Sequence, residues 1–231
     1  MEKKKLVTTV TAVALLGALA IGGTLAYLTD TETKTNEFTI NNEVDIELTE
    51  DNWDPDNGDG VTPNATVAKD PAVKNNKEEK VIVFLKVESP KDTIQLKDDD
   101  SATNQELFWF YSGNEPTSIL EENTFNSSWV QLTKYYDDSE DEVNTYIFGY
   151  SAILDQNDVT NTLFDYVQLK NYIGAEDADD NPTAADFVVT AYAIQADNLY
   201  TADGSAVIDT SDLTDENTLV SIYETYLADT E

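Results

Sequence analysis

The chain has 231 residues, of which 46 are Asp or Glu and 13 are Lys or Arg, and its formal net charge is −33. A surface this acidic, with no basic patch to offset it, repels nucleic acid and anionic lipid. The sequence contains no histidine and no cysteine, which excludes Ser-His-Asp and Cys-His catalytic sites and zinc sites built on two histidines. Because 40% of the residues are hydrophobic and 10% are aromatic, we expect a folded domain rather than disorder.

The N-terminal segment, residues 1–26, has the order of an export signal. Lysines at residues 3–5 precede a long uncharged run that is rich in Ala, Gly and Thr. The small residues Thr24 and Ala26 then stand three positions before, and directly before, a cleavage site in front of Tyr27. Basic, apolar and small residues in this order predict a cleaved signal peptide. The alternative is a single membrane span that is retained as an anchor.

The exported part of the chain is long enough for one good hydrophobic core and marginal for two. A domain of this size does not need disulfides, and the absence of cysteine fits bacterial export better than the animal secretory route. We therefore expect a protein that is secreted to the extracellular matrix or the cell surface. Its negative charge opposes side-by-side association unless salt or divalent cations screen it.

Residues 27–36, which follow the predicted cleavage site, alternate with a period of two. The odd positions, Tyr27, Thr29, Thr31, Thr33 and Thr35, form a mostly β-branched face, and the even positions are mostly charged. From Phe38 onward the apolar residues fall on even positions instead. One strand cannot change its buried face without a bulge or a break. This pattern predicts an extended N-terminal arm that is separate from the strands of the domain, and a solvated linker is the alternative.

Residues 37–231 are predicted to form a single jelly-roll-like β domain. Strands are expected within residues 38–48, 81–87, 107–111, 129–136, 145–154, 163–169 and 187–194. The run at 81–87 is almost continuously apolar, as expected for a strand that is buried on both faces. Acidic loops at 97–103, 137–142 and 177–181 separate the strands. Many short strands joined by turn-rich loops are typical of an all-β sandwich or jelly roll.

The C-terminal segment is predicted to be a helix near residues 214–228. Its apolar residues, Leu219, Ile222, Tyr223, Tyr226 and Leu227, fall at the spacing of one helical stripe. Thr214 is the expected N-cap, and the carboxylates of Asp215 and Glu216 would lie near the positive end of the helix dipole. We expect the stripe to pack against the β domain.

Two clusters suggest ligand binding. Asp54, Asp56 and Asp59 stand close together around glycines, and hard oxygen ligands of this kind suit calcium, although the spacing does not match an EF-hand loop. A solvated acidic turn is the favoured interpretation, so we expect no cofactor, and calcium binding is the alternative. The aromatic residues Trp53, Trp109, Trp129, Tyr135 and Tyr136 could form a sugar-binding platform, but aromatics so distributed are more often core residues.

Several segments in sequence order resemble the TasA/camelysin family of secreted biofilm matrix proteins of Gram-positive bacteria, which a SipW-type signal peptidase processes. They are GGTLAYLTD at 22–30, NEFTINNEVDIEL at 36–48, KDPAVKNN at 69–76 followed by VIVFLKV, LFDYVQL at 163–169, and FVVTAYAIQADN at 187–198. The resemblance implies a jelly-roll β domain and a structural role in the extracellular matrix. In fibre-forming members of the family, the arm after the signal completes the sheet of the next subunit.

The arm and the resemblance together predict a secreted subunit that forms fibres by donor-strand complementation, adding its arm to the next subunit. The expected partners are further copies of the chain and, during export, the signal peptidase; a co-assembling matrix accessory protein is left open. Nucleic acid is not expected as a partner, and membrane contact is expected only through the uncleaved signal. Some camelysin relatives are described as metallopeptidases, but without histidine we expect no enzyme here. The alternative function is a monomeric cell-surface module that binds glycan or calcium.

Overall fold

The computed structural model describes residues 29–33, 36–38, 44–97, 99–139, 142–173, 185–201 and 203–228. The predicted signal peptide, with its cleavage residues Thr24, Ala26 and Tyr27, lies outside these ranges, as does Thr35 of the predicted arm. Within the described ranges, no helix combines the length and the apolar character that a membrane crossing requires.

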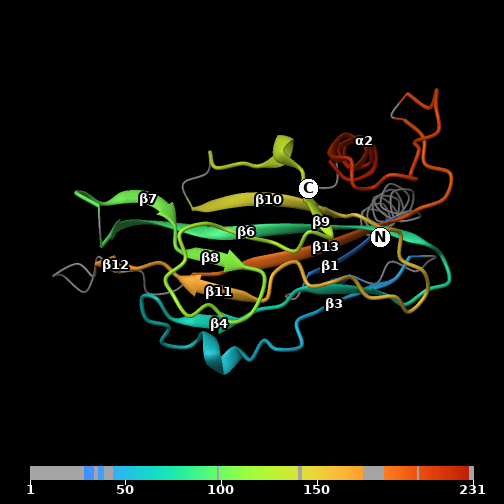
Figure 1. Ribbon diagram of the computed structural model, residues 1–231. Helices are drawn as coiled ribbons and strands as arrows, with labels where there is room; N and C mark the ends of the chain where they lie inside the picture. Colours follow the sequence, from blue (N-terminus) through green and yellow to red (C-terminus); the bar gives the residue numbers. More distant parts are fainter. Residues whose placement is uncertain are drawn as a thin grey trace, which may run out of the picture.

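The largest sheet in the described part of the chain has eight strands, and all its pairings are antiparallel (Figure 1). Its main path runs in the order β2 (Asn36–Phe38), β1 (Thr29–Thr33), β13 (Val188–Gln195), β6 (Val81–Leu96), β10 (Val143–Tyr150) and β9 (Trp129–Gln131). Two further strands, β7 (Thr103–Glu106) and β12 (Tyr172–Ile173), pair with β6 off this path.

Smaller sheets form the second layer. One has the order β4 (Thr66–Ala68), β11 (Tyr166–Leu169) and β8 (Phe108–Tyr111), and the other pairs β3 (Ile46–Thr49) with β5 (Ala72–Asn75). Two short 3-10 helices, η1 (Pro55–Gly58) and η2 (Thr133–Tyr135), lie in the connections. Side chains from both layers share one core, with Val73, Phe110 and Val167 meeting Leu85 and Phe148. The predicted fold, an all-β sandwich of jelly-roll type with a C-terminal helix, is confirmed.

Strand β6 lies between two separate cores. Val83 and Leu85 pack into the interior of the sandwich, whereas Ile82 and Phe84 pack on the opposite face of the sheet. Successive side chains of a strand point to opposite faces, so the near-continuous apolar run at 81–87 supplies both cores. The prediction of a strand buried on both faces is confirmed.

The second core lies beneath the C-terminal helix, α2 (Glu216–Tyr226), on the side of the large sheet away from β4, β11 and β8 (Figure 1). Leu219, Ile222 and Tyr223 of α2 are buried there, as the stripe predicted. The ring of Tyr223 packs against that of Phe84 with 5.6 Å between the centroids. The helix therefore seals this face of the sheet.

The predicted N-cap is wrong by one position. Asp215 caps α2, because its side chain accepts a hydrogen bond of 3.2 Å from the backbone N–H of Asn217. Thr214 instead donates its hydroxyl to the carboxylate of Asp212. Thr214 therefore belongs to the turn before the helix, and Asp215 is the N-cap. The carboxylate of Asp215 also lies near the positive end of the helix dipole.

Candidate functional site: the β1–β13 edge and its pocket

The described part of the predicted arm belongs to the protein's own large sheet, where β1 lies between the outermost strand β2 and β13. Strand β1 runs antiparallel to β13, with the Cα pairs Thr29–Ile194, Thr31–Tyr192 and Thr33–Thr190 at its two ends and centre. Three of the predicted donor residues, Thr29, Thr31 and Thr33, are thus paired within the same chain. Addition of this strand to another subunit stays a prediction, and it would have to begin from this docked state.

The predicted phase change does not coincide with a break in the strands. The sequence analysis placed it between Asn36 and Phe38, whereas β2 covers Asn36–Phe38 without interruption. β1 ends at Thr33, and the two strands pair antiparallel with Thr33 opposite Asn36. Asn36, which the sequence placed at the end of the arm, is therefore the first residue of the outermost strand, and the chain reverses before it.

The two sides of β13 are covered to different extents. On one side β13 pairs with β6 along its whole length, from Val188 to Gln195. On the other side the pairing with β1 stops at Thr190. Among the described residues, no strand covers Val188 and Val189 on that second side. In the described part of the chain, the start of β13 is therefore an open edge, where backbone groups can pair with an added strand.

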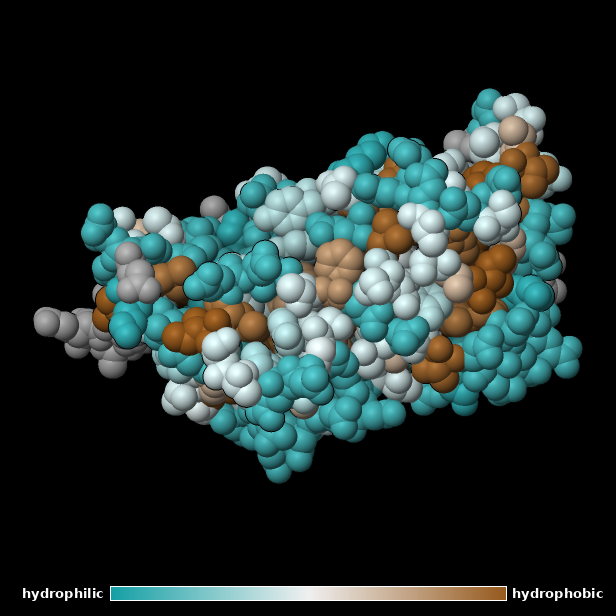
Figure 2. All heavy atoms as spheres, viewed as in Figure 1, coloured by the Kyte–Doolittle hydropathy of each residue, from teal (hydrophilic) through white to brown (hydrophobic). Residues whose placement is uncertain are grey.

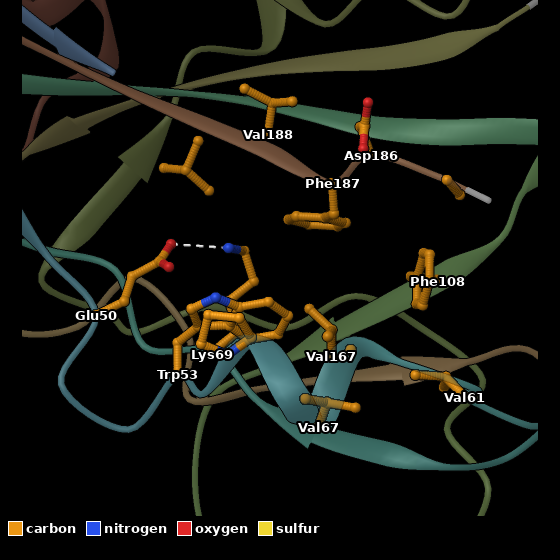
Figure 3. Close-up of a pocket in the computed structure, with 14 residues that line it drawn as sticks. Glu50, Trp53, Val61, Val67, Lys69, Phe108, Val167, Asp186, Phe187 and Val188 are labelled. Atoms are coloured by element: carbon orange, nitrogen blue, oxygen red, sulfur yellow. Dashed lines mark hydrogen bonds and ion pairs between the residues drawn. The ribbon is translucent and has the colours of Figure 1, made fainter. Parts of the chain in front are cut away.

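A pocket of about 710 Å³ lies against this open edge (Figure 3). Its walls are largely apolar and are supplied by Val61, Val67, Phe108, Val167, Phe187 and Val189. Most of these residues belong to the sandwich core or pack against it. The pocket is thus a place where the gap between the two layers of the sandwich opens to the outside beside β13.

One end of the pocket carries a buried ion pair. Lys69 Nζ lies 2.8 Å from Glu50 Oε1, and the two side chains are only 8% and 1% exposed. The ammonium group also lies 4.9 Å from the centroid of the Trp53 ring, as Figure 3 shows from the side. Nearby, Asp70 fixes the loop by accepting hydrogen bonds from the backbone and side-chain nitrogens of Asn52, at 3.0 and 2.8 Å. Both charges of the pair are held by partners, which favours a structural role over a catalytic one.

The calcium candidates lie on the loop beside this pocket. Asp54 caps η1, since its carboxylate accepts a hydrogen bond of 3.0 Å from the backbone N–H of Asp56. Asp54, Asp56 and Asp59 are all exposed. Within the described ranges, no three acidic side chains gather in an arrangement that could hold a metal ion. The local geometry gives Asp54 the role of capping η1, and calcium binding stays a prediction.

The five aromatic candidates for a sugar platform are divided among separate parts of the fold. Trp129 is 2% exposed within the core and donates its indole N–H to the carbonyl of Asn161 at 3.0 Å. Tyr135 packs on Tyr223 of α2, whereas Tyr136 packs on Tyr146. Trp53 borders the pocket and Trp109 lies on β8. The five side chains do not form a single flat surface.

A second buried lysine, which the sequence analysis did not single out, lies on the other side of β8. Lys170 is 5% exposed, and its ammonium group lies 3.7 Å from the centroid of the Trp109 ring. Burial lowers the pKa of Lys170, and the charge of Glu106 opposes this shift. Glu106 accepts a hydrogen bond of 2.9 Å from Tyr146, whose pKa is raised by burial and then by that carboxylate. The alternation of residues 167–170 places Lys170 on the face opposite Val167 and Leu169, so no local pattern indicated that Lys170 is buried.

Comparison of the chain with protein-family models, with curated proteins and with solved structures finds no match. The resemblance to the TasA/camelysin family therefore rests on the sequence segments alone.

Proposed function

We propose that the protein is a secreted structural subunit of the extracellular matrix, which assembles into fibres by passing β1 to a neighbouring copy. The observation that supports this most is the position of β1, which lies between the outermost strand β2 and β13 and pairs with β13 through the main chain. Pairing of this kind depends little on side chains, so the same strand can pair with β13 of another copy. A strand passed from each copy to the next does not close on itself and produces a filament.

The docked arm makes assembly an exchange reaction. Pairing within one chain and pairing between two chains use the same residues of β1 and β13, so their free energies are similar and concentration shifts the balance. The predicted signal peptide directly precedes β1 along the chain. Before its removal the arm would be attached to the membrane, and exchange would start only after export.

The test uses the absence of natural cysteine. In the register of the two strands, Thr33 and Thr190 are directly paired, so the variants Thr33→Cys and Thr190→Cys report on this contact. Mature protein of each single variant is mixed, concentrated under mild oxidation and analysed for disulfide-linked dimers. We expect linked dimers containing one chain of each kind. A mixture of Thr33→Cys with Ser101→Cys is the control, because Ser101 is exposed and lies in the link between β6 and β7.

The double variant, with both cysteines in one chain, extends the test. Oxidation at low concentration closes the arm onto its own β13, and we expect this form to stay monomeric by electron microscopy until a reductant is added. Fibres that grow equally well from the closed form would contradict the proposal. So would fibres of the mixed single variants that contain no link between Thr33→Cys and Thr190→Cys.

A further inference from the structure

The pocket beside β13 has the size and the lining of a site for a small molecule. Its volume of about 710 Å³ lies within the range of about 300–1,000 Å³ that is typical of such sites. Valine side chains and the rings of Phe108 and Phe187 form most of its wall, and the two rings meet edge to face with 6.1 Å between their centroids. An apolar chain that enters the pocket would exchange water for contacts with hydrocarbon.

The loop at one end of the pocket is held in place by its own contacts. Asn52 bonds to Asp70 through its backbone and side-chain nitrogens, and the carboxylate of Asp54 caps η1. In the same loop, a Cβ atom at Gly58 would lie only 3.1 Å from the ring of Trp53, so the glycine lets the loop pack directly against this ring. Trp53 is therefore a fixed part of the wall, and a ligand loses little free energy to ordering it.

The inner end of the pocket has no place for a further charge. The ammonium group of Lys69 lies between the rings of Trp53 and Phe187, 4.9 and 6.0 Å from their centroids (Figure 3). A second cation here would be repelled by Lys69, and an anion would have to compete with Glu50, whose carboxylate lies 2.8 Å from the ammonium group. The apolar part of a ligand therefore belongs at this end.

The mouth of the pocket is acidic. The 3-10 helix η1 contributes to the wall, and Asp54, Asp56 and Asp59 are exposed on the same loop. Asp186 also lines the pocket and is exposed. Of the described residues that line the pocket, Lys69 is the only base, and its charge is compensated by the ion pair. The mouth therefore favours a positive group over a negative one.

We infer that the pocket binds an amphiphilic cation, whose apolar chain lies against Phe108 and Phe187 and whose positive head lies at the mouth beside η1. The apolar wall supplies the contacts of the chain, and the carboxylates of the loop attract the head. The Lys69–Glu50 pair closes the inner end, so the ligand enters with its chain first. This binding goes beyond the proposed structural role, and a single copy has all the residues that it uses.

Three probes that share one alkyl chain test the chemistry of the ligand. Octyltrimethylammonium, octanol and octanoate carry a positive, a neutral and a negative head, and calorimetry measures their binding to dilute mature protein at low ionic strength. We expect the affinity to fall in this order, with octyltrimethylammonium binding about 10-fold more tightly than octanoate. Added salt should reduce this difference. Octanoate that binds as tightly as the cation, or no saturable binding of any probe, would overturn the inference.

Variants of the wall show whether the alkyl chain enters this pocket. Val67→Phe places a ring in the space for the chain and should weaken the binding of octyltrimethylammonium by about 10-fold or more. Val61→Phe, at a half-buried position of the wall, makes the same test if Val67→Phe does not fold. Trp53→Phe should keep the heat of binding and lose the accompanying change in tryptophan fluorescence. Unchanged affinity in the folded wall variant would place the ligand elsewhere and contradict the assignment.

Two double variants with the same change in net charge test the position of the head. Asp56→Asn/Asp59→Asn removes two carboxylates at the mouth, whereas Glu78→Gln/Asp138→Asn removes two exposed carboxylates that do not line the pocket. We expect the first to lower the affinity for octyltrimethylammonium about 3-fold or more, the second to leave it nearly unchanged, and neither to alter the binding of octanol. Equal losses would mean that the overall charge attracts the cation, and the head would then have no site beside η1.

Discussion

The two faces of β13 and β6 differ in how completely they are covered. On the α2 face, Ile82, Phe84 and Ile194 are at most 1% exposed and pack against Leu219 and Ile222, which are fully buried. On the interior face, the sandwich opens beside the start of β13 into a pocket of about 710 Å³. One face is filled, and the other keeps a space that the described residues do not occupy.

We expect the filled face to contribute to the stability of the fold and the open face to be available for assembly. A filled core derives its stability from close packing and tolerates neither added nor removed volume. An open apolar pocket contributes less to stability and leaves apolar surface for a partner. On the face seen in Figure 2, hydrophilic residues cover much of the surface, and the apolar patches between them are separate. This face therefore offers little continuous apolar surface to a partner. Binding is therefore expected at the open edge of β13 rather than over the sheet faces.

The largest effect is expected at the ion pair that closes one end of the pocket. Glu50→Leu would leave the ammonium group of Lys69 buried without its carboxylate, and we expect a loss of about 3–5 kcal/mol in the free energy of unfolding. The double variant Glu50→Leu/Lys69→Met should lose much less than the sum of its two single variants. Urea unfolding of the four proteins measures this coupling.

The exposed pair Lys80–Asp155 provides the matched control. Its nitrogen–oxygen distance, 2.9 Å, is nearly that of the buried pair, but its side chains are 54% and 63% exposed. Asp155→Leu should leave the stability almost unchanged, because water screens the charge that remains. Equal losses from Glu50→Leu and Asp155→Leu would show that burial of the pocket pair is not what makes it important.

The same substitution on the filled and the open part of the interior tests the comparison directly. Val83 is fully buried in the core, whereas Val67 lines the pocket. Val83→Phe should cost about 1–3 kcal/mol or more by overpacking, and Val67→Phe should change the free energy of unfolding by less than about 1 kcal/mol. Chemical unfolding measures both. A similar cost at the two positions would mean that the pocket cannot accept a ring.

Much of the fold could be predicted from alternation and helical spacing, because burial imposes both patterns. The apolar run of β6 and the stripe of α2 are of this kind. The sequence analysis missed β7, which reads TNQE, because a short polar strand is determined by its partner. β6 itself continues past Pro90, where its partner changes from β10 to β7, and no local pattern indicates such a change.

The site was predicted less completely. The phase change was expected between Asn36 and Phe38, but β2 runs through these residues and the chain reverses before Asn36. Alternation also does not specify which sheet an arm joins, since main-chain pairing is possible with any open edge. The pair of Lys69 with Glu50 links residues 19 positions apart and depends on how the loop after β3 folds over the sandwich. The pocket has no sequence signal of its own, because its walls are ordinary core residues.

A smaller effect concerns the second buried lysine, for which the described residues supply no ion pair like that of Lys69. Burial lowers the pKa of Lys170 below its value of 10.5 in the unfolded chain. Between these two values the unfolded state binds more protons, so the stability of the natural protein should rise with pH relative to Lys170→Met. We expect this relative gain to appear on the alkaline side of neutral pH, as the folded state loses its proton before the unfolded chain does.

Urea unfolding at several pH values measures this change. Taking the difference between natural protein and variant removes the contribution of Tyr146, which has the opposite sign. Its raised pKa makes the folded state bind more protons above about pH 10, so its contribution to stability declines there. Lys77→Met, at an exposed position, should show no such slope. A flat difference for Lys170→Met would mean that the ring of Trp109 compensates fully for the lost water.

The smallest effect is expected from salt, which acts on assembly and leaves the two faces of β13 as they are. With a formal charge of −33, copies repel each other over a Debye length of about 30 Å at 0.01 M ionic strength and about 8 Å at 0.15 M. Raising the salt should therefore speed fibre growth several-fold, as measured by light scattering. Screening changes how often copies meet, so the form closed by the Thr33→Cys/Thr190→Cys disulfide should stay monomeric at every salt concentration. If salt instead made the closed form polymerise, charge rather than exchange of β1 would control assembly.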